Sequence, residues 1–148
     1  MASLVKAYGI VPYYVKGDDI KILLCKSVAS KDRWGCLKGT KTRNETAYEC
    51  AKREFFEESS ISVDVALFEE YFEQLNDDKD VGIWLVNFKN IENIEKYFTN
   101  DTLKEQYLSW ENSKVKFFSL NNLPKIKKKQ QDLINEIKDF LKSKNLHH

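Results

Sequence analysis

The sequence has almost no histidine, and this scarcity excludes several catalytic mechanisms. Of 148 residues only His147 and His148 are histidines, and they end the chain as a tail or the remnant of a purification tag. Ser-His-Asp catalysis, Cys-His catalysis and a phosphohistidine intermediate all require a histidine in the folded domain. We therefore expect any chemistry to depend on carboxylates, lysines, hydroxyls or a metal ion.

Cysteine, glycine, proline and long apolar runs are also scarce. Three cysteines, at positions 25, 36 and 50, have no CxxC spacing, which argues against disulfides or a thiolate metal site and favours a reduced, cytoplasmic setting. Five glycines and two prolines exclude a fibrous or linker-like chain. No run approaches the roughly 20 apolar residues of a membrane span. We expect one globular domain over residues 1–146 and no membrane association.

Charge of neither sign dominates the sequence. Lysine and arginine number 24 against 23 aspartates and glutamates, so the whole-molecule field attracts neither nucleic acid nor acidic surfaces strongly. Stable DNA binding is not expected, and both a monomer and a homodimer are compatible with this composition. Any function that depends on charge must come from a local cluster.

Runs of β-branched and aromatic residues predict strands over residues 4–15, 20–25, 63–75, 81–88 and 115–120. Turn residues at 17–19 and 76–80 join the first four strands into two hairpins. Residues 89–110 are polar, and three apolar residues within them indicate a short helix. A stripe with helical spacing predicts a terminal amphipathic helix, with Leu133, Ile134, Ile137, Phe140 and Leu141 on one face. Strands with one central and one terminal helix indicate a mixed sheet covered on both faces, an α+β arrangement.

The clearest helix is predicted over residues 42–60, with Asn44 as its N-cap and Glu45 in the first turn. Tyr48 and Phe55 form a bulky apolar side. Successive residues of a helix are rotated by 100°, which places a second group of residues on one face. This face carries small residues first and acids after them, namely Ala47, Cys50, Ala51, Glu54, Glu57 and Glu58.

The three acids of this face stand at positions i, i+3 and i+4 and therefore repel one another. At about 4 Å and an effective dielectric near 20, each pair costs on the order of 4 kcal/mol. Protonation of one carboxylate, neutralisation by Arg53 and nearby lysines, or a divalent cation offsets this cost. The bland alternative is a solvated helix end.

The spacing around these acids resembles the Nudix box, the loop-helix-loop signature of hydrolases that act on nucleoside diphosphates linked to another group. Five residues separate Gly39 from Glu45, seven more precede Arg53, and the acids follow, ending at Ser60 and Ile61. Ser60 is the one departure, because the family has glycine there. We expect it in the left-handed turn that ends the helix, where a side chain costs about 1 kcal/mol.

The resemblance extends beyond the box. Residues 34–39 are similar to the family's approach strand, and residues 117–120 with the following Leu-Pro are similar to its closing strand. It implies a Nudix-type α/β/α sandwich with a mixed β-sheet between helices.

By the same resemblance, the side chains of Glu54, Glu57 and Glu58 and the carbonyl of Gly39 hold Mg²⁺ or Mn²⁺, for which oxygen ligands are suited. The ions neutralise the diphosphate and activate a water that attacks phosphorus. Arg53 orients the glutamates through a bidentate contact with Glu45, although an ordinary ion pair explains these two residues as well.

A further acid is expected from outside the box. Glu111 is the first choice, because it precedes the closing strand at the interval where several family members place a metal-binding or basic glutamate. Glu70, Glu73 and the acidic turn at residues 77–80 are the alternatives.

Three other residues are candidates for substrate binding. Lys38 precedes Gly39, as in members that handle polyphosphates, and touches either a phosphate oxygen or solvent. Trp34 and Tyr71 stack on a base or belong to the core, where aromatic residues in strands are more often found. The lysines at positions 125 and 127–129 guide RNA or polyphosphate, or form the wet side of the last helix.

The resemblance implies a metal-dependent pyrophosphohydrolase. The first substrate hypothesis is a dinucleoside polyphosphate of the diadenosine tetraphosphate type, or the 5′-triphosphate end of RNA. An ADP-ribose or nucleotide-sugar pyrophosphatase is the second. A relative that has lost turnover and only binds nucleotide, as a sensor, is an alternative of another class.

Overall fold

A mixed β-sheet forms the centre of the protein. The computed structural model describes residues 5–30 and 32–144, so the predicted tail at His147 and His148 lies outside the described residues. In this part of the chain the strands follow the order β4-β5-β1-β2-β8-β7-β6, and β3 pairs with β1. Only the β1–β5 pair is parallel. The strands are β1 (Lys6–Lys16), β2 (Asp19–Ser27), β3 (Leu37–Thr40), β4 (Tyr71–Gln74), β5 (Asp80–Asn87), β6 (Phe98–Thr99), β7 (Thr102–Leu103) and β8 (Asn112–Ser119).

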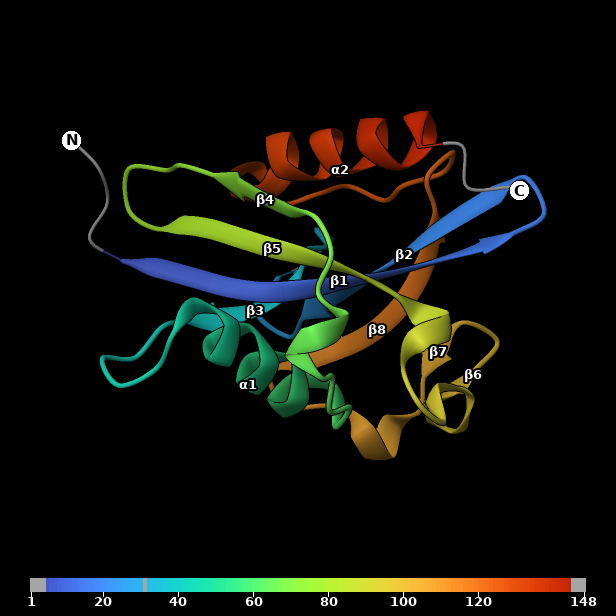
Figure 1. Cartoon of the computed structure of the whole chain (residues 1–148), viewed down its shortest axis with the longest axis horizontal. Coiled ribbons are helices and arrows are strands. Elements are labelled where there is room, and N and C mark those ends of the chain that lie inside the picture. The colour runs from blue at the N-terminus through green and yellow to red at the C-terminus, as the bar shows by residue number, and fades with distance from the viewer. Residues whose placement is uncertain (1–4, 31, 145–148) are drawn as a thin grey trace.

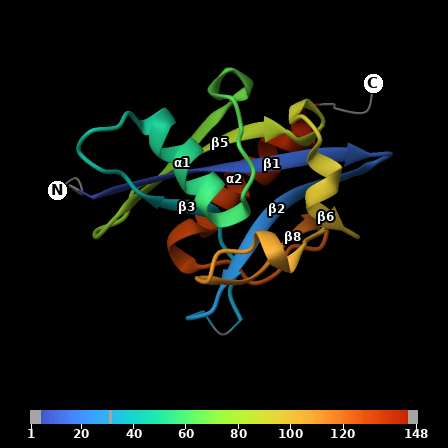
Figure 2. The same ribbon diagram turned by 90° about the horizontal axis from the view of Figure 1, so that it is seen from below.

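Two helices cover opposite faces of this sheet, α1 (Ala47–Ser59) and α2 (Gln131–Ser143) (Figures 1 and 2). Successive side chains of a strand point to opposite faces. Accordingly, Ile10 packs in the core cluster that contains α1, and Val11 packs in the cluster that contains α2. The predicted α/β/α arrangement is thereby confirmed. Neither helix is long and apolar enough to cross a membrane, within the residues described.

Both predicted hairpins are present. Gly17 adopts a positive φ of 63° in the turn between β1 and β2, a conformation that costs glycine little. The second hairpin joins β4 to β5, but its first strand is shorter than predicted. The predicted strand is shortened at its start. The Asp64 side chain accepts a hydrogen bond from the Ala66 amide at 2.9 Å and starts a 3₁₀ turn where the strand was predicted.

The short helix predicted within residues 89–110 is present only in part. The described segment forms short 3₁₀ helices, one of them over Ile94–Tyr97, and the small β6–β7 hairpin, but no α-helix. Asn100 and Asp101, which join the two strands, have φ values of 49° and 67°. Two successive positive φ values suit a two-residue hairpin turn, and Asn and Asp tolerate them better than most residues.

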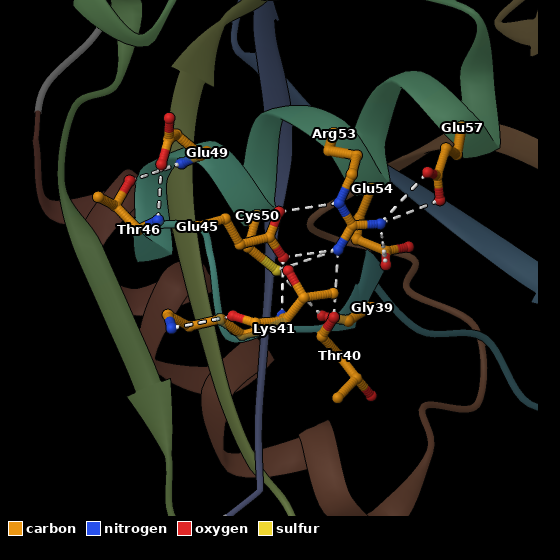
Figure 3. A network of polar contacts seen from close by, with 11 residues as sticks. Gly39, Thr40, Lys41, Glu45, Thr46, Glu49, Cys50, Arg53, Glu54 and Glu57 are labelled. Carbon is orange, nitrogen blue, oxygen red and sulfur yellow. Dashed lines mark hydrogen bonds and ion pairs between the residues drawn. The ribbon is translucent and has the colours of Figure 1, made fainter.

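The α1 helix begins later than predicted, so the assignments of Asn44 as N-cap and of Glu45 to the first turn are wrong. Thr46 is the N-cap: its hydroxyl accepts from the Glu49 amide at 3.1 Å, and the Glu49 carboxylate accepts from the Thr46 amide at 2.7 Å (Figure 3). This reciprocal capping box satisfies two free amides at the helix start. Glu45 remains in the preceding loop, where its carboxylate accepts from the Thr42 amide at 2.9 Å.

The bulky apolar side predicted for α1 is present, with one buried and one exposed ring. Phe55 is fully buried, whereas Tyr48 is 51% exposed and stacks on Trp84 with ring centroids 4.6 Å apart. Trp84 and Phe55 belong to the same core cluster. All three cysteines are buried and free, as expected from their spacing.

Ser60 occupies the left-handed turn that the sequence predicted, with φ 67° and ψ 8°. Its hydroxyl donates to the Tyr107 carbonyl at 3.2 Å. Ser60→Gly and Ser60→Ala both lose this bond, but only alanine keeps a Cβ in the left-handed region. We expect the glycine variant to be more stable than the alanine variant by about 1 kcal/mol, measured by urea unfolding. Equal stabilities would show that the Cβ causes no strain here.

Candidate active site

The three predicted glutamates lie in the second half of α1, where the helix crosses β3. Glu54 continues the buried face of the helix, and its side chain is only 15% exposed. Glu58 is half-buried, while Glu57 lies further toward solvent with 54% of its side chain exposed. One helical turn thus presents two half-buried carboxylates and an open one.

Arg53 is the centre of the polar network around these acids (Figure 3). Its Nε and Nη2 donate to the two Glu45 oxygens at 2.9 and 2.7 Å, so the predicted bidentate contact is present. Its Nη1 donates to Glu54 at 2.8 Å and to Glu57 at 3.2 Å. Nη2 also donates to the Thr40 carbonyl at 3.2 Å. The positive charge of Arg53 therefore offsets the repulsion between the Glu54 and Glu57 carboxylates, as one of the possibilities above predicted.

Gly39 brings the backbone of β3 directly against Glu54. A Cβ added at Gly39 would lie 1.9 Å from the Glu54 Cδ, so no other residue fits without moving the carboxylate. The Gly39 carbonyl accepts a weak bond from the Cys50 thiol at 3.4 Å. The helix and strand are close because Cys50 and Ala51 are small.

Glu58 is positioned by a residue that the sequence did not reveal. The buried Asn112, at the start of β8, donates from Nδ2 to a Glu58 oxygen at 3.1 Å. Burial raises the pKa of the Glu58 carboxyl to about 7, and the Asn112 hydrogen bond opposes this rise. Burial likewise raises the pKa of Glu54, against the effect of Arg53. The only sequence signal for Asn112 is its place beside Glu111.

Glu111 lies in the turn immediately before β8 and is exposed. Its neighbour in the sequence, Asn112, donates to Glu58, so the backbone at Glu111 runs close to the carboxylate helix. Two of the alternatives considered for the outside acid are engaged elsewhere: Glu73 accepts from the Tyr71 hydroxyl at 3.0 Å, and Asp80 pairs with a lysine of β1. Glu111 remains the predicted acid outside the box.

The chemistry of this donor set suits a divalent cation, because carboxylate and carbonyl oxygens are hard ligands. The side chains stand in another arrangement, however: within residues 5–30 and 32–144 no three acid, histidine or cysteine groups are close enough together to hold an ion. Glu54 and Glu57 face Arg53, and Glu58 faces Asn112.

The residues considered for substrate binding lie in three different environments. Trp34 is 9% exposed and packs edge-on against Phe118, with ring centroids 4.6 Å apart, so its ring belongs to the core. Tyr71 is 38% exposed and lies beside Trp84, with centroids also 4.6 Å apart. Lys38 lines a cavity next to β3, and burial lowers the pKa of its ammonium group. Lys38 therefore has the placement for a phosphate contact, whereas Trp34 has no open face for a base.

The Glu45–Arg53 contact predicts a specific dependence of stability on pH. Hydrogen bonds from Arg53 lower the pKa of Glu45 from 4.5 to about 2. Its contribution is complete above pH 4.5 and is lost as the pH falls toward 2. We expect Glu45→Gln to be less stable than the wild type at pH 7 by about 1 kcal/mol or more, with the gap closing below pH 4. Urea unfolding at pH 7, 4 and 3 measures it, and a gap independent of pH would contradict this origin.

Comparison with protein families and solved structures agrees with this geometry. The NUDIX domain family matches residues 4–140, whereas the search of curated proteins gives no match. Among solved structures, a C. elegans Ap4A hydrolase in a binary complex has a TM-score of 0.66 and 24% identity, covering 95% of this chain and 99% of its own.

Two further structures share the fold at lower identity. A NUDIX hydrolase from Nitrosomonas europaea has a TM-score of 0.64 at 16% identity, covering 97% of this chain and 73% of its own. The NUDIX domain of Shewanella oneidensis NrtR, complexed with ADP ribose, has a TM-score of 0.61 at 16% identity, covering 95% and 90%. Since the family match extends over most of the sequence and contains the whole carboxylate helix, the chain belongs to the NUDIX family of pyrophosphohydrolases.

Proposed function

We propose that this protein hydrolyses a pyrophosphate bond in a nucleotide with a chain of several phosphates, in the presence of Mg²⁺ or Mn²⁺. The substrates we propose are a dinucleoside polyphosphate of the diadenosine tetraphosphate type and the 5′-triphosphate end of RNA. The observation that carries the proposal is the crossing of helix and strand at which Glu54 meets Gly39 and Arg53 binds Glu54 and Glu57, with Glu58 next to them on the same helix.

Each part of this crossing has a defined task. Gly39 allows the Glu54 carboxylate to lie against the backbone of β3, and Asn112 orients Glu58. Arg53 holds Glu54 and Glu57 in reach of the same space while Glu45 anchors the guanidinium group. A bound divalent cation supplies charge neutralisation at the phosphates and a more acidic water. We propose Glu111 as the base that would accept a proton from that water.

We choose a polyphosphate as the substrate because a lysine, Lys38, precedes the glycine that meets the Glu54 carboxylate. Lys38 directly precedes Gly39 in β3 and lines the cavity beside that strand. The C. elegans neighbour is an Ap4A hydrolase, a protein named for a substrate with four phosphates. The NrtR domain binds ADP ribose, which has two phosphates, and this compound is the comparison substrate in the test.

The decisive experiment is a hydrolysis assay with products identified by mass. The protein is incubated with Mg²⁺ and, separately, with diadenosine tetraphosphate, ADP-ribose, nucleoside triphosphates, and capped or triphosphorylated RNA. We expect cleavage of a polyphosphate substrate that stops when EDTA removes the metal. Preferred cleavage of ADP-ribose would overturn the substrate assignment, and nucleotide binding without any product would indicate a sensor.

A further inference from the structure

A cavity of about 430 Å³ lies beside β3 and is lined mainly by cationic side chains. The cations come from three distant parts of the sequence: the segment around β3, the β4–β5 turn and the segment before α2. We refer to them as the lysine pocket, and they are Arg33, Lys38, Lys79, Lys127, Lys128 and Lys129. Such a convergence of like charge requires a physical explanation, just as the crowded glutamates do.

Few of these charges are compensated within the protein. Lys129 pairs with Asp78, the one acid that lines the cavity among the described residues, and Arg33 donates to the Ile126 carbonyl at 2.8 Å. The ammonium groups of Lys38, Lys79, Lys127 and Lys128 have no hydrogen bond or ion pair with any described residue. A bound anion would supply the missing counter-charge.

The charges of the pocket act on one another. The side chains of Lys38, Lys79 and Lys127 all line this one cavity, so their positive charges repel one another. Like charges that disfavour each other's ionised form gain from a shared anion. A chain of phosphates presents several negative charges in a row and so matches several lysines better than a single phosphate does.

The position of β3 connects the pocket to the carboxylates. Alternate residues of a strand face opposite sides, so Gly39 faces Glu54 while Lys38 faces the cavity on the other side. In the described chain β3 pairs only with β1, which leaves its other edge without a strand partner. A ligand lying along that edge would pass from Gly39, which meets Glu54, to Lys38, which lines the pocket. Lys38 and Gly39 are neighbours in β3, so the two sites adjoin at this strand.

We propose that the lysine pocket binds the phosphates of the substrate that lie beyond the pyrophosphate held at the glutamates. This inference rests on the proposed function and specifies its substrate class: a chain of three or more phosphates. Dinucleoside polyphosphates and 5′-triphosphate RNA share this chemistry, and a substrate with only two phosphates does not reach the pocket.

Binding of inorganic phosphates tests the pocket without any hydrolysis. Tripolyphosphate and pyrophosphate are titrated into the protein in EDTA and followed by calorimetry. We expect tripolyphosphate to bind more tightly than pyrophosphate, and Lys79→Ala/Lys127→Ala to weaken tripolyphosphate by about tenfold or more. Lys125→Ala is the matched control, because this lysine pairs with Asp32 outside the cavity, and its affinity should change less than about twofold. Equal binding by the double variant and wild type would overturn the proposal.

Steady-state kinetics then test whether the pocket binds the substrate and which substrate supplies the phosphates. In the double variant we expect the KM for diadenosine tetraphosphate, for 5′-triphosphate RNA, or for both, to rise about tenfold, while the KM for ADP-ribose changes less than about twofold. The substrate that shows the rise is the source of the phosphates. An equal rise for ADP-ribose would overturn the specific role of the pocket. Lysine-dependent tripolyphosphate binding by a protein that hydrolyses nothing would refute the proposed function and leave the pocket standing.

Discussion

Replacing Glu57 by glutamine should reduce turnover by about 100-fold or more, because the change removes one charge from the three carboxylates proposed to hold the metal ion. Glutamine has nearly the same shape and retains an oxygen that accepts from Arg53. Glu57 is 54% exposed and its ion pair with Arg53 is at the surface, so stability should change by less than about 1 kcal/mol. Steady-state kinetics at saturating Mg²⁺ and thermal unfolding measure the two effects.

Glu136→Gln is the matched control for Glu57. Glu136 is an exposed acid on α2, on the opposite face of the sheet, and the same substitution there should leave turnover unchanged. Undiminished activity in Glu57→Gln would overturn the site assignment. A large loss of stability in that variant would instead show that Glu57 mainly neutralises Arg53.

The arrangement of layers was predictable because it depends on local patterns. Runs of strand-forming residues with turn residues between them predict the two hairpins, and the spacing of the acids in the box predicts three carboxylates on one helix. The start of α1 was not predictable in the same way. Glu45 could serve either the helix dipole or Arg53, and the bidentate contact with Arg53 keeps it in the loop, so that Thr46 begins the helix.

Contacts between residues that are far apart in the sequence could not be predicted from it. Asn112 meets Glu58 over a separation of 54 residues, and no local pattern marks an asparagine at the start of a strand as a partner for an acid. The lysine pocket combines Lys38, Lys79 and Lys127, which come together only once the sheet has formed. The net charge of the chain is close to zero and gives no information about which charged residues lie close together in the fold, so it did not indicate this cluster.

The second large effect is expected at Gly39, which has no side chain because Glu54 occupies that space. In Gly39→Ala the new Cβ would lie 1.9 Å from the Glu54 Cδ and 2.1 and 2.3 Å from its two oxygens. The carboxylate must rotate away and break its 2.8 Å bond to Arg53. Since a displacement of about 1 Å in a catalytic group costs on the order of 100-fold in rate, we expect a loss of this size in kcat/KM. Thr40→Ala, at the next and exposed position, should retain activity because Arg53 binds only its backbone carbonyl.

A second substitution separates the steric cause from a general defect of β3. Glu54→Asp shortens the side chain by one methylene, which withdraws the carboxylate from the space that the alanine Cβ needs. The Gly39→Ala/Glu54→Asp variant should therefore recover thermal stability relative to Gly39→Ala, while its activity stays low because the shortened acid no longer reaches its place. If the double variant is as unstable as the single one, the cost of alanine lies in the pairing of β3 with β1. If Gly39→Ala alone keeps full activity, Glu54 has another productive position, and the close approach of helix and strand is not what places the carboxylates.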